Sequence, residues 1–115
     1  EQGWVAVLMA TIKQALQNLK SNGPGYYPCL VGGKLHINRD GNSYMLVRND
    51  THESVCQWNK HTGVVWVLGE LAWHEKSVIN QITEVWRPGY QVDWETWEAT
   101  HRKAYKTLLP LKQSA

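Results

Sequence analysis

Two cysteines and five histidines are the side chains of this sequence best suited to nucleophilic chemistry. Thiol catalysis needs a thiolate, a nearby base and a group that orients the base. Cys29 precedes Gly32-Gly33 near a chain turn, and Cys56 lies in a strand-like run typical of a small core residue. No helix start beside Cys29 is indicated that would lower its pKa. The candidate bases are His36, His52, His61 and His74. We expect no catalytic residue, and a Cys/His acyl-transfer or hydrolase enzyme is the alternative.

A metal site would have to use His52, Cys56 and His61, which are spaced by four and five residues. A structural zinc site takes four ligands, commonly in two close pairs. The trio has only the distant His74 to complete it, so the sequence predicts no metal site and no cofactor.

The carboxylates and glycines show no catalytic pattern either. A general acid needs a carboxyl group in an apolar pocket, whereas the helix starts account for Glu70, Glu75, Asp93, Glu95 and Glu98. Gly32-Gly33 lacks the lysine and the repeated glycines of a nucleotide-binding loop.

Aromatic side chains favour a binding function instead. Seven Trp and five Tyr stand beside no Phe, and both types pair a large apolar ring with a polar handle that suits an interface. Trp58 and Trp66 fall on facing strands, where they would contact an apolar side chain of a protein partner. Bases of a single-stranded nucleic acid, stacked on the same rings, are the alternative. The binding residues that we expect are Tyr44, Arg48, Trp58, Lys60, Trp66, Arg102, Lys103 and Lys106.

Residues 4–20 carry apolar residues at helical spacing, with polar residues on the opposite face. This pattern predicts an amphipathic N-terminal helix that ends before the Gly and Pro of residues 21–25.

The middle of the chain changes to the alternating period of strands. Residues 34–38 and 43–48 flank an Asp-Gly pair, and residues 54–58 and 64–68 flank a second loop that contains Gly63. Two hairpins in succession predict a four-stranded antiparallel meander.

Helical spacing returns from Glu75 and ends at Arg87-Pro88-Gly89. Asp93 is placed to cap a last helix that runs to about Leu109. The sequence therefore predicts a single α+β domain over residues 1–115, in which an N-terminal helix and two C-terminal helices cover one face of the meander.

Composition narrows the class of protein further. The 115 residues are 43% hydrophobic and contain no apolar run near 18 residues, so we expect no membrane span. A net charge of +2 permits but does not require a nucleic acid. Two cysteines exclude a disulfide-rich secreted scaffold, and we expect free thiols in a cytoplasmic setting, with a secreted one as the alternative. A homodimer is compatible with so small a domain.

The run of residues 84–91, which is followed by Trp94, resembles the segment that leads into the H-box of the H-box/NC acyltransferase and phospholipase family. That family includes some picornavirus 2A proteins. In the family a catalytic His follows the Tyr-Gln pair, and here Val92 and Asp93 stand instead, with no Asn-Cys box downstream. The resemblance therefore implies a non-catalytic relative.

Gln2-Gly3 and Gln113-Ser114 resemble the junctions that chymotrypsin-like cysteine proteases of positive-strand RNA viruses cut. Together with the aromatic excess, these features predict a non-enzymatic protein-interaction module, processed from a viral polyprotein.

Overall fold

The computed structural model describes residues 12–21, 27–28, 33–102 and 104–114. Four features of the sequence analysis lie outside these residues: the Gln2-Gly3 pair, the start of the N-terminal helix, Cys29 and Lys103.

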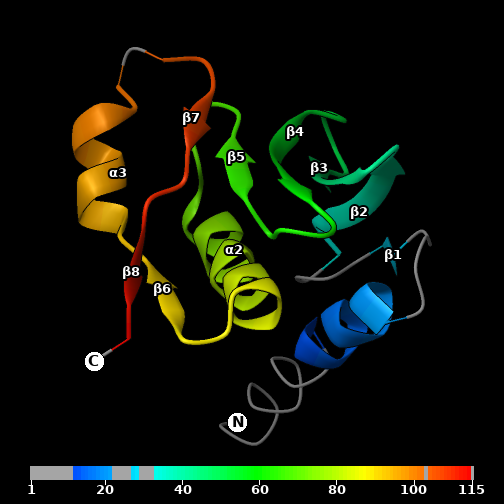
Figure 1. The fold of residues 1–115 in the computed structure, drawn as a ribbon. Helices are drawn as coiled ribbons and strands as arrows, with labels where there is room; N and C mark the ends of the chain where they lie inside the picture. Colours follow the sequence, from blue (N-terminus) through cyan, green and yellow to red (C-terminus); the bar gives the residue numbers. More distant parts are fainter. Residues whose placement is uncertain (1–11, 22–26, 29–32, 103, 115) are drawn as a thin grey trace, which may run out of the picture.

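A six-stranded antiparallel sheet forms the centre of the fold (Figure 1), with the strand order β1-β2-β3-β4-β5-β7. Its strands are β1 (Tyr27–Pro28), β2 (Leu35–Asp40), β3 (Ser43–Arg48), β4 (Ser54–Asn59), β5 (Val65–Val67) and β7 (Thr107–Leu108). The four strands from β2 to β5 are the predicted meander. The short β1 and β7 strands extend it at either edge.

Glycines allow both predicted hairpins to turn. Gly41 takes a φ of +60° in the turn between β2 and β3, and Gly63 takes a φ of +70° in the loop between β4 and β5. Gly63 also lies against α2 (Trp73–Trp86), because a Cβ at this position would come within 2.7 Å of the Cβ of Trp86. A larger residue at position 63 would therefore separate the β4–β5 loop from the helix.

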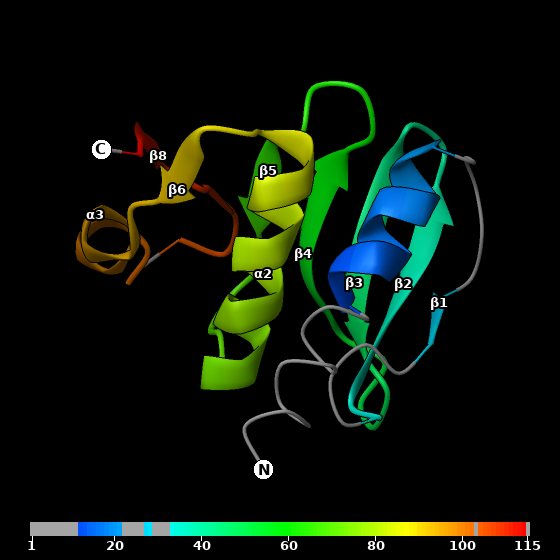
Figure 2. The same cartoon turned by 90° about the horizontal axis from the view of Figure 1, so that it is seen from below.

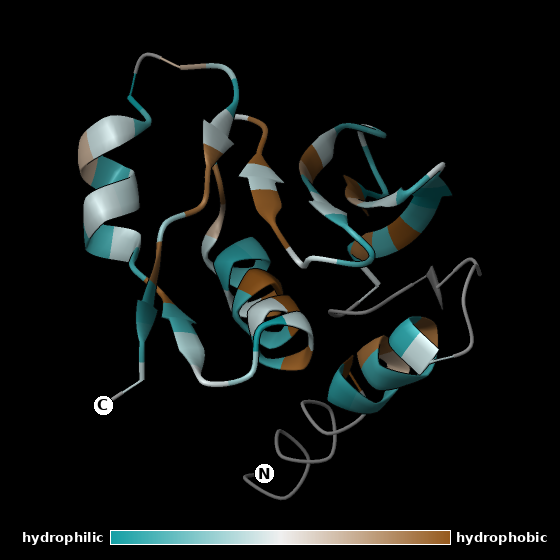
Figure 3. Cartoon of the chain, viewed as in Figure 1, coloured by the Kyte–Doolittle hydropathy of each residue, from teal (hydrophilic) through white to brown (hydrophobic). Residues whose placement is uncertain are grey.

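Two helices cover one face of the sheet (Figure 2). Residues 12–21 are helical, and their buried residues Ile12, Leu16 and Leu19 have the spacing that the sequence predicted. The helix α2 lies beside this helix, and in both of them apolar and polar residues alternate around the axis (Figure 3). None of the described helices combines the length and hydropathy that a membrane crossing requires.

The opposite face of the sheet carries one continuous row of side chains across five strands. In the register of the sheet, the row runs through Asn38, Met45, Gln57, Trp66 and Leu108. The first four are half-buried, and Leu108 is exposed. No helix among the described residues packs on this row.

The last helix is shorter than the sequence predicted. α3 spans Trp94–Thr100, and the chain then enters β7 and β8 (Leu111–Gln113) instead of continuing as a helix to Leu109. β7 pairs with the edge strand β5, and β8 pairs with β6 (Tyr90–Val92). These pairings satisfy the backbone N–H and C=O groups at the edges of β5 and β6. The periodicity of residues 101–109 alone does not indicate such distant partners.

Three aromatic rings hold α2 on the meander. The ring centroid of Trp58 lies 5.4 Å from that of Tyr44 and 5.5 Å from that of Trp86, and the indole of Trp86 donates a hydrogen bond to the Lys60 carbonyl. Tyr44 and Trp58 are fully buried, so the expectation that they are exposed binding residues was wrong. Trp58 pairs with Val65 across the strands and Trp66 pairs with Gln57, so the two tryptophans lie on opposite faces of the sheet.

Stability measurements should separate these two tryptophans. We expect Trp58→Ala to lower the free energy of unfolding by about 3–5 kcal/mol, because it empties the centre of the aromatic core. Trp66→Ala should cost about 1 kcal/mol, the order of one cross-strand pair on a half-exposed face. Denaturant titrations of both variants measure the difference. Equal losses would contradict the assignment of the two rings to core and surface.

Candidate functional site

An aromatic hollow lies between the start of α2 and the start of α3. Trp73, Lys76, Asn80 and Trp94 line this hollow of about 320 Å³. Trp73 is 82% exposed, which is unusual for so large an apolar side chain, while Trp94 is half-buried against the core. Exposed tryptophan of this kind is typical of a binding surface.

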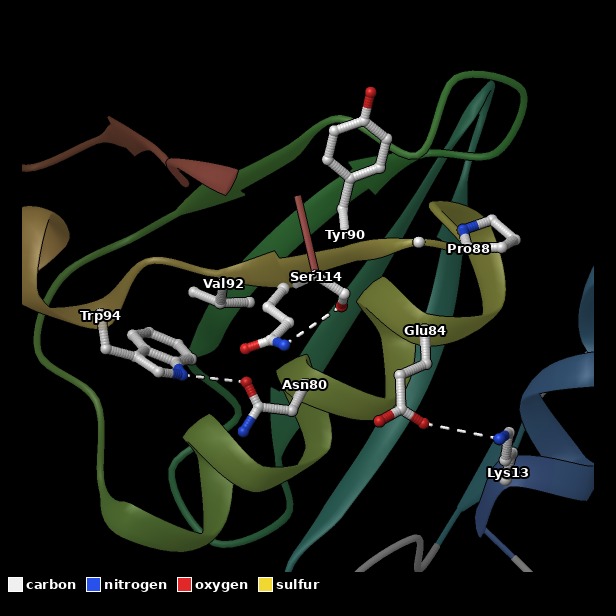
Figure 4. A pocket seen from close by; sticks show the side chains of 10 residues that line it. Lys13, Asn80, Glu84, Pro88, Tyr90, Val92, Trp94 and Ser114 are labelled. Carbon is white, nitrogen blue, oxygen red and sulfur yellow. Dashed lines mark hydrogen bonds and ion pairs between the residues drawn. The ribbon is translucent and has the colours of Figure 1, made fainter. Parts of the chain in front are cut away.

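A second, more polar hollow of about 510 Å³ continues from the first along α2 (Figure 4). Asn80 and Trp94 line both hollows, so the two are adjacent. The polar end adds Lys13, Glu84, Gln91 and Ser114, and Gln91 donates a hydrogen bond to the Ser114 hydroxyl. We call the two hollows together the aromatic groove.

Local sequence explains how the groove is built. Trp73, Lys76, Asn80 and Glu84 recur at helical spacing on the face of α2 that is turned away from the buried Val78, Ile79 and Ile82. On the other side of the groove, Asp93 caps α3 by accepting hydrogen bonds from the Thr96 hydroxyl and amide. These hydrogen bonds hold the pKa of Asp93 below its ordinary value. The cap fixes Trp94 in the first turn of α3.

The hydrogen bond from Trp94 fixes which end of the Asn80 side-chain amide faces the indole. The indole Nε1 of Trp94 donates to Oδ1 of Asn80 at 2.9 Å, as the dashed line in Figure 4 marks. An indole N–H is a donor only, so the atom that it meets must be the carbonyl oxygen. The Nδ2 group of Asn80 therefore points away from Trp94, and no acceptor for it occurs among the described residues.

Lys13, Lys76 and Glu84, the charged side chains that line the groove, each belong to an ion pair. Lys76 bonds to Glu98 at 2.8 Å, and its Nζ lies 5.5 Å from the ring centroids of Trp94 and Trp97. The hydrogen bond from Lys76 holds the pKa of Glu98 below its ordinary value. At the other end, Lys13 meets Glu84 at 3.5 Å. The groove thus offers rings and amides more than net charge.

Only part of the predicted binding set comes together. Lys106 places its Nζ 5.0 Å from the ring centroid of Trp66, on the face of the sheet opposite the helices. Lys60 is half-buried, and its carbonyl accepts the hydrogen bond from Trp86. Arg102 follows the end of α3 and lines a separate hollow with His101. The structure therefore separates these residues into distinct regions.

Sequence reasoning missed Trp73 and Asn80. The signal for both was present, since positions 73 and 80 share a helix face that excludes Val78 and Ile79. Nothing in the sequence indicated that the start of α3 would lie beside that face.

The Arg48 side chain, which we expected to bind a partner, is instead hydrogen-bonded within the fold. Its guanidinium donates to both carboxylate oxygens of Glu75, at 2.7 and 3.0 Å, and to the Glu70 carbonyl. Glu75 also accepts a hydrogen bond from the Ala72 amide at the start of α2. The pair ties β3 to the first turn of α2.

The environment of Glu75 favours its charged form. Its side chain is only 2% exposed, and this burial raises the pKa, but hydrogen bonds from Arg48 and Ala72 outweigh that effect. The net result is a pKa below the ordinary value of 4.5. The hydrogen bond with Glu75 in turn raises the pKa of Arg48.

Removal of this carboxylate should destabilise the fold in a pH-dependent way. We expect Glu75→Gln to cost about 2–3 kcal/mol at neutral pH, toward the low end for buried pairs because the Arg48 side chain is 28% exposed. Because the folded pKa is lowered, the contribution is complete above about pH 4.5 and is lost as pH falls through the folded value. The free energies of unfolding of wild type and Glu75→Gln, measured by denaturant titration across this pH range, should therefore converge in acid.

A matched control is available at the other acidic partner of Arg48. Glu53 lies 3.3 Å from Arg48, but its side chain is 64% exposed. Glu53→Gln should change the free energy of unfolding by less than about 1 kcal/mol. A constant difference between wild type and Glu75→Gln at every pH would contradict the role of the charge.

Cys56 is a core residue. The thiol is fully buried and free, and burial raises its pKa. A nucleophilic cysteine needs exposure and a lowered pKa. Among the described residues, no group of three or more His, Cys, Asp or Glu side chains is arranged to hold a metal ion.

The reactivity of Cys56 can be tested directly. In a Cys29→Ser variant, we expect the folded protein to resist Ellman's reagent, because the remaining thiol is buried and protonated. The same sample in concentrated guanidinium chloride should release one equivalent of chromophore. Native-state labelling at the rate of a free thiol would revive the thiol-enzyme alternative for Cys56.

Comparisons with known proteins found no similarity from which to infer a function. No family model matches the sequence, and neither curated proteins nor solved structures give a significant match. Residues 84–91, which carry the resemblance to the H-box/NC family, form the end of α2 and the start of β6. This segment contributes Glu84, Tyr90 and Gln91 to the polar end of the groove.

Proposed function

We propose that this chain is a non-enzymatic protein-interaction module that binds a partner polypeptide in the aromatic groove. The observation that carries the proposal is Trp73, which is 82% exposed and shares a hollow with Trp94. A tryptophan that becomes buried on binding contributes strongly to affinity, and tryptophan is enriched among the residues that dominate interfaces.

The surroundings of Trp73 support a preformed site. Trp94 is held by its hydrogen bond to Asn80 and by an edge contact with the buried Trp97, whose ring centroid is 5.6 Å away. Lys76 is restrained by Glu98. A groove with fixed walls loses less conformational entropy when a ligand binds.

Selection from a peptide library tests this function for any partner sequence. A displayed library of random linear peptides is panned against the protein, and the enriched clones are assayed on variants. We expect clones that bind wild type to lose at least tenfold in affinity on Trp73→Ala, because that ring is the most exposed wall of the groove. Binding is measured by calorimetry with the synthesised peptides.

Tyr105→Ala is the matched control, since Tyr105 is 80% exposed but does not line the groove. Its affinity for the same peptides should equal that of wild type. If no clone is enriched, or if the clones bind Trp73→Ala unchanged, the proposed function is wrong.

Three expectations remain predictions. Single-stranded nucleic-acid binding would use Trp66 and Lys106, which are in contact on the opposite face of the sheet. A viral, 2A-like origin and a cytoplasmic setting rest on the sequence alone.

A further inference from the structure

The aromatic end of the groove offers hydrogen-bond donors and almost no acceptors. Its polar side-chain groups are the indoles of Trp73 and Trp94, the ammonium of Lys76 and the amide of Asn80. The Trp94 indole is used by its hydrogen bond to Oδ1 of Asn80, and Lys76 is bonded to Glu98. The donors that have no partner among the described residues are therefore the Trp73 indole and Nδ2 of Asn80, while Oδ1 of Asn80 is the one side-chain acceptor and already takes one hydrogen bond. Backbone carbonyls in the middle of α2 are used within the helix.

A ligand that fits such a surface has many acceptors and few donors. An ordinary extended peptide carries one N–H for each carbonyl, and each N–H that is buried without a partner costs free energy. Proline has no N–H, so a proline-rich segment presents carbonyls alone. The Nδ2 group of Asn80, which has no acceptor among the described residues, is positioned to donate to one of them.

The shape and charge of the hollow agree with this ligand. Trp73 and Trp94 line a space of about 320 Å³, which suits a compact, rigid pyrrolidine ring packed against an indole. Since Lys76 is paired with Glu98, the site has no uncompensated charge that would select an acidic or phosphorylated ligand.

Polyproline II makes no internal hydrogen bonds, so its carbonyls stay available as acceptors. Because the Trp94 indole bonds to Asn80, a proline between the two tryptophans would lie beside Asn80, whose Nδ2 group could donate to its carbonyl.

We propose that the aromatic end of the groove binds a proline-rich segment of the partner in the polyproline II conformation. This inference rests on the proposed function and specifies its ligand. The segment is already ordered before binding, so even a shallow groove can hold it with useful affinity.

Octaproline, capped at both ends, is the probe, and capped peptides of Gly-Ser repeats and of an amphipathic helix-forming sequence are the comparisons. In ¹H–¹⁵N spectra we expect octaproline to shift the indole resonances of Trp73 and Trp94 and the side-chain amide of Asn80, in a saturable way. The Gly-Ser peptide should leave them unchanged.

Variants separate the two features on which the proposal depends. Trp73→Ala should weaken octaproline binding at least tenfold, because it removes one wall. Asn80→Asp keeps an oxygen for the Trp94 indole but removes the donor, and should weaken binding about fivefold. Tyr105→Ala should bind as wild type does.

The outcomes distinguish the ligand from the function. If octaproline binds neither wild type nor any variant, while library peptides or the helix-forming peptide bind in a way that depends on Trp73, the proline assignment is wrong and the interaction function stands. If no peptide binds in a Trp73-dependent way, both are wrong. Octaproline binding that is insensitive to both Trp73→Ala and Asn80→Asp also overturns the proposal.

Discussion

The ion pair between Arg48 and the buried Glu75 fixes the position of α2, and the rest of the molecule depends on that position. Arg48 belongs to β3, and Glu75 belongs to the first turn of the helix, so the two hydrogen bonds join elements that are distant in sequence. Removal of a charge from water is costly, and only the combination of guanidinium, Ala72 amide and carboxylate compensates for it here. Such a pair tolerates little displacement, which gives the start of α2 a defined place on the sheet.

The groove follows from this constraint. Trp73 lies two residues before Glu75, so the turn that buries the carboxylate leaves the indole pointing outward. At the other end of α2, Trp86 packs on Tyr44 and Trp58, and the helix is held at both ends. The exposed stripe between these anchors then meets Trp94 at the start of α3. The aromatic groove is thus formed on a helix that is held at both ends, with Trp94 packed against the core and Trp73 exposed.

Much of the fold could be predicted from short-range patterns. Periodicity predicted α2 and the buried face of residues 12–21. Periodicity and the glycines of the two turns, which adopt positive φ, predicted the hairpins. The end of α3 could not be predicted in this way. Residues 101–109 keep apolar residues near helical spacing, but Thr107 and Leu108 pair with β5, and Thr107 accepts a hydrogen bond from the Trp97 indole. Those partners are remote in sequence, so no local pattern reports them.

The sequence by itself determined that the protein is an α+β domain, rich in tryptophan, and that Cys56 is a core residue, because these properties depend on composition and on local period. The tertiary structure decided which aromatic rings are exposed. The register between β4 and β5 places Trp58 and Trp66 on opposite faces, and the packing of two helices on one of these faces makes Trp58 a core residue. Trp73 and Trp94 are far apart in the chain and line the same hollow, because Lys76 and Asn80 of α2 bond to Glu98 and Trp94 of α3. A candidate site made of such residues is a property of the fold, since the contacts that position Trp94 come from residues elsewhere in the chain.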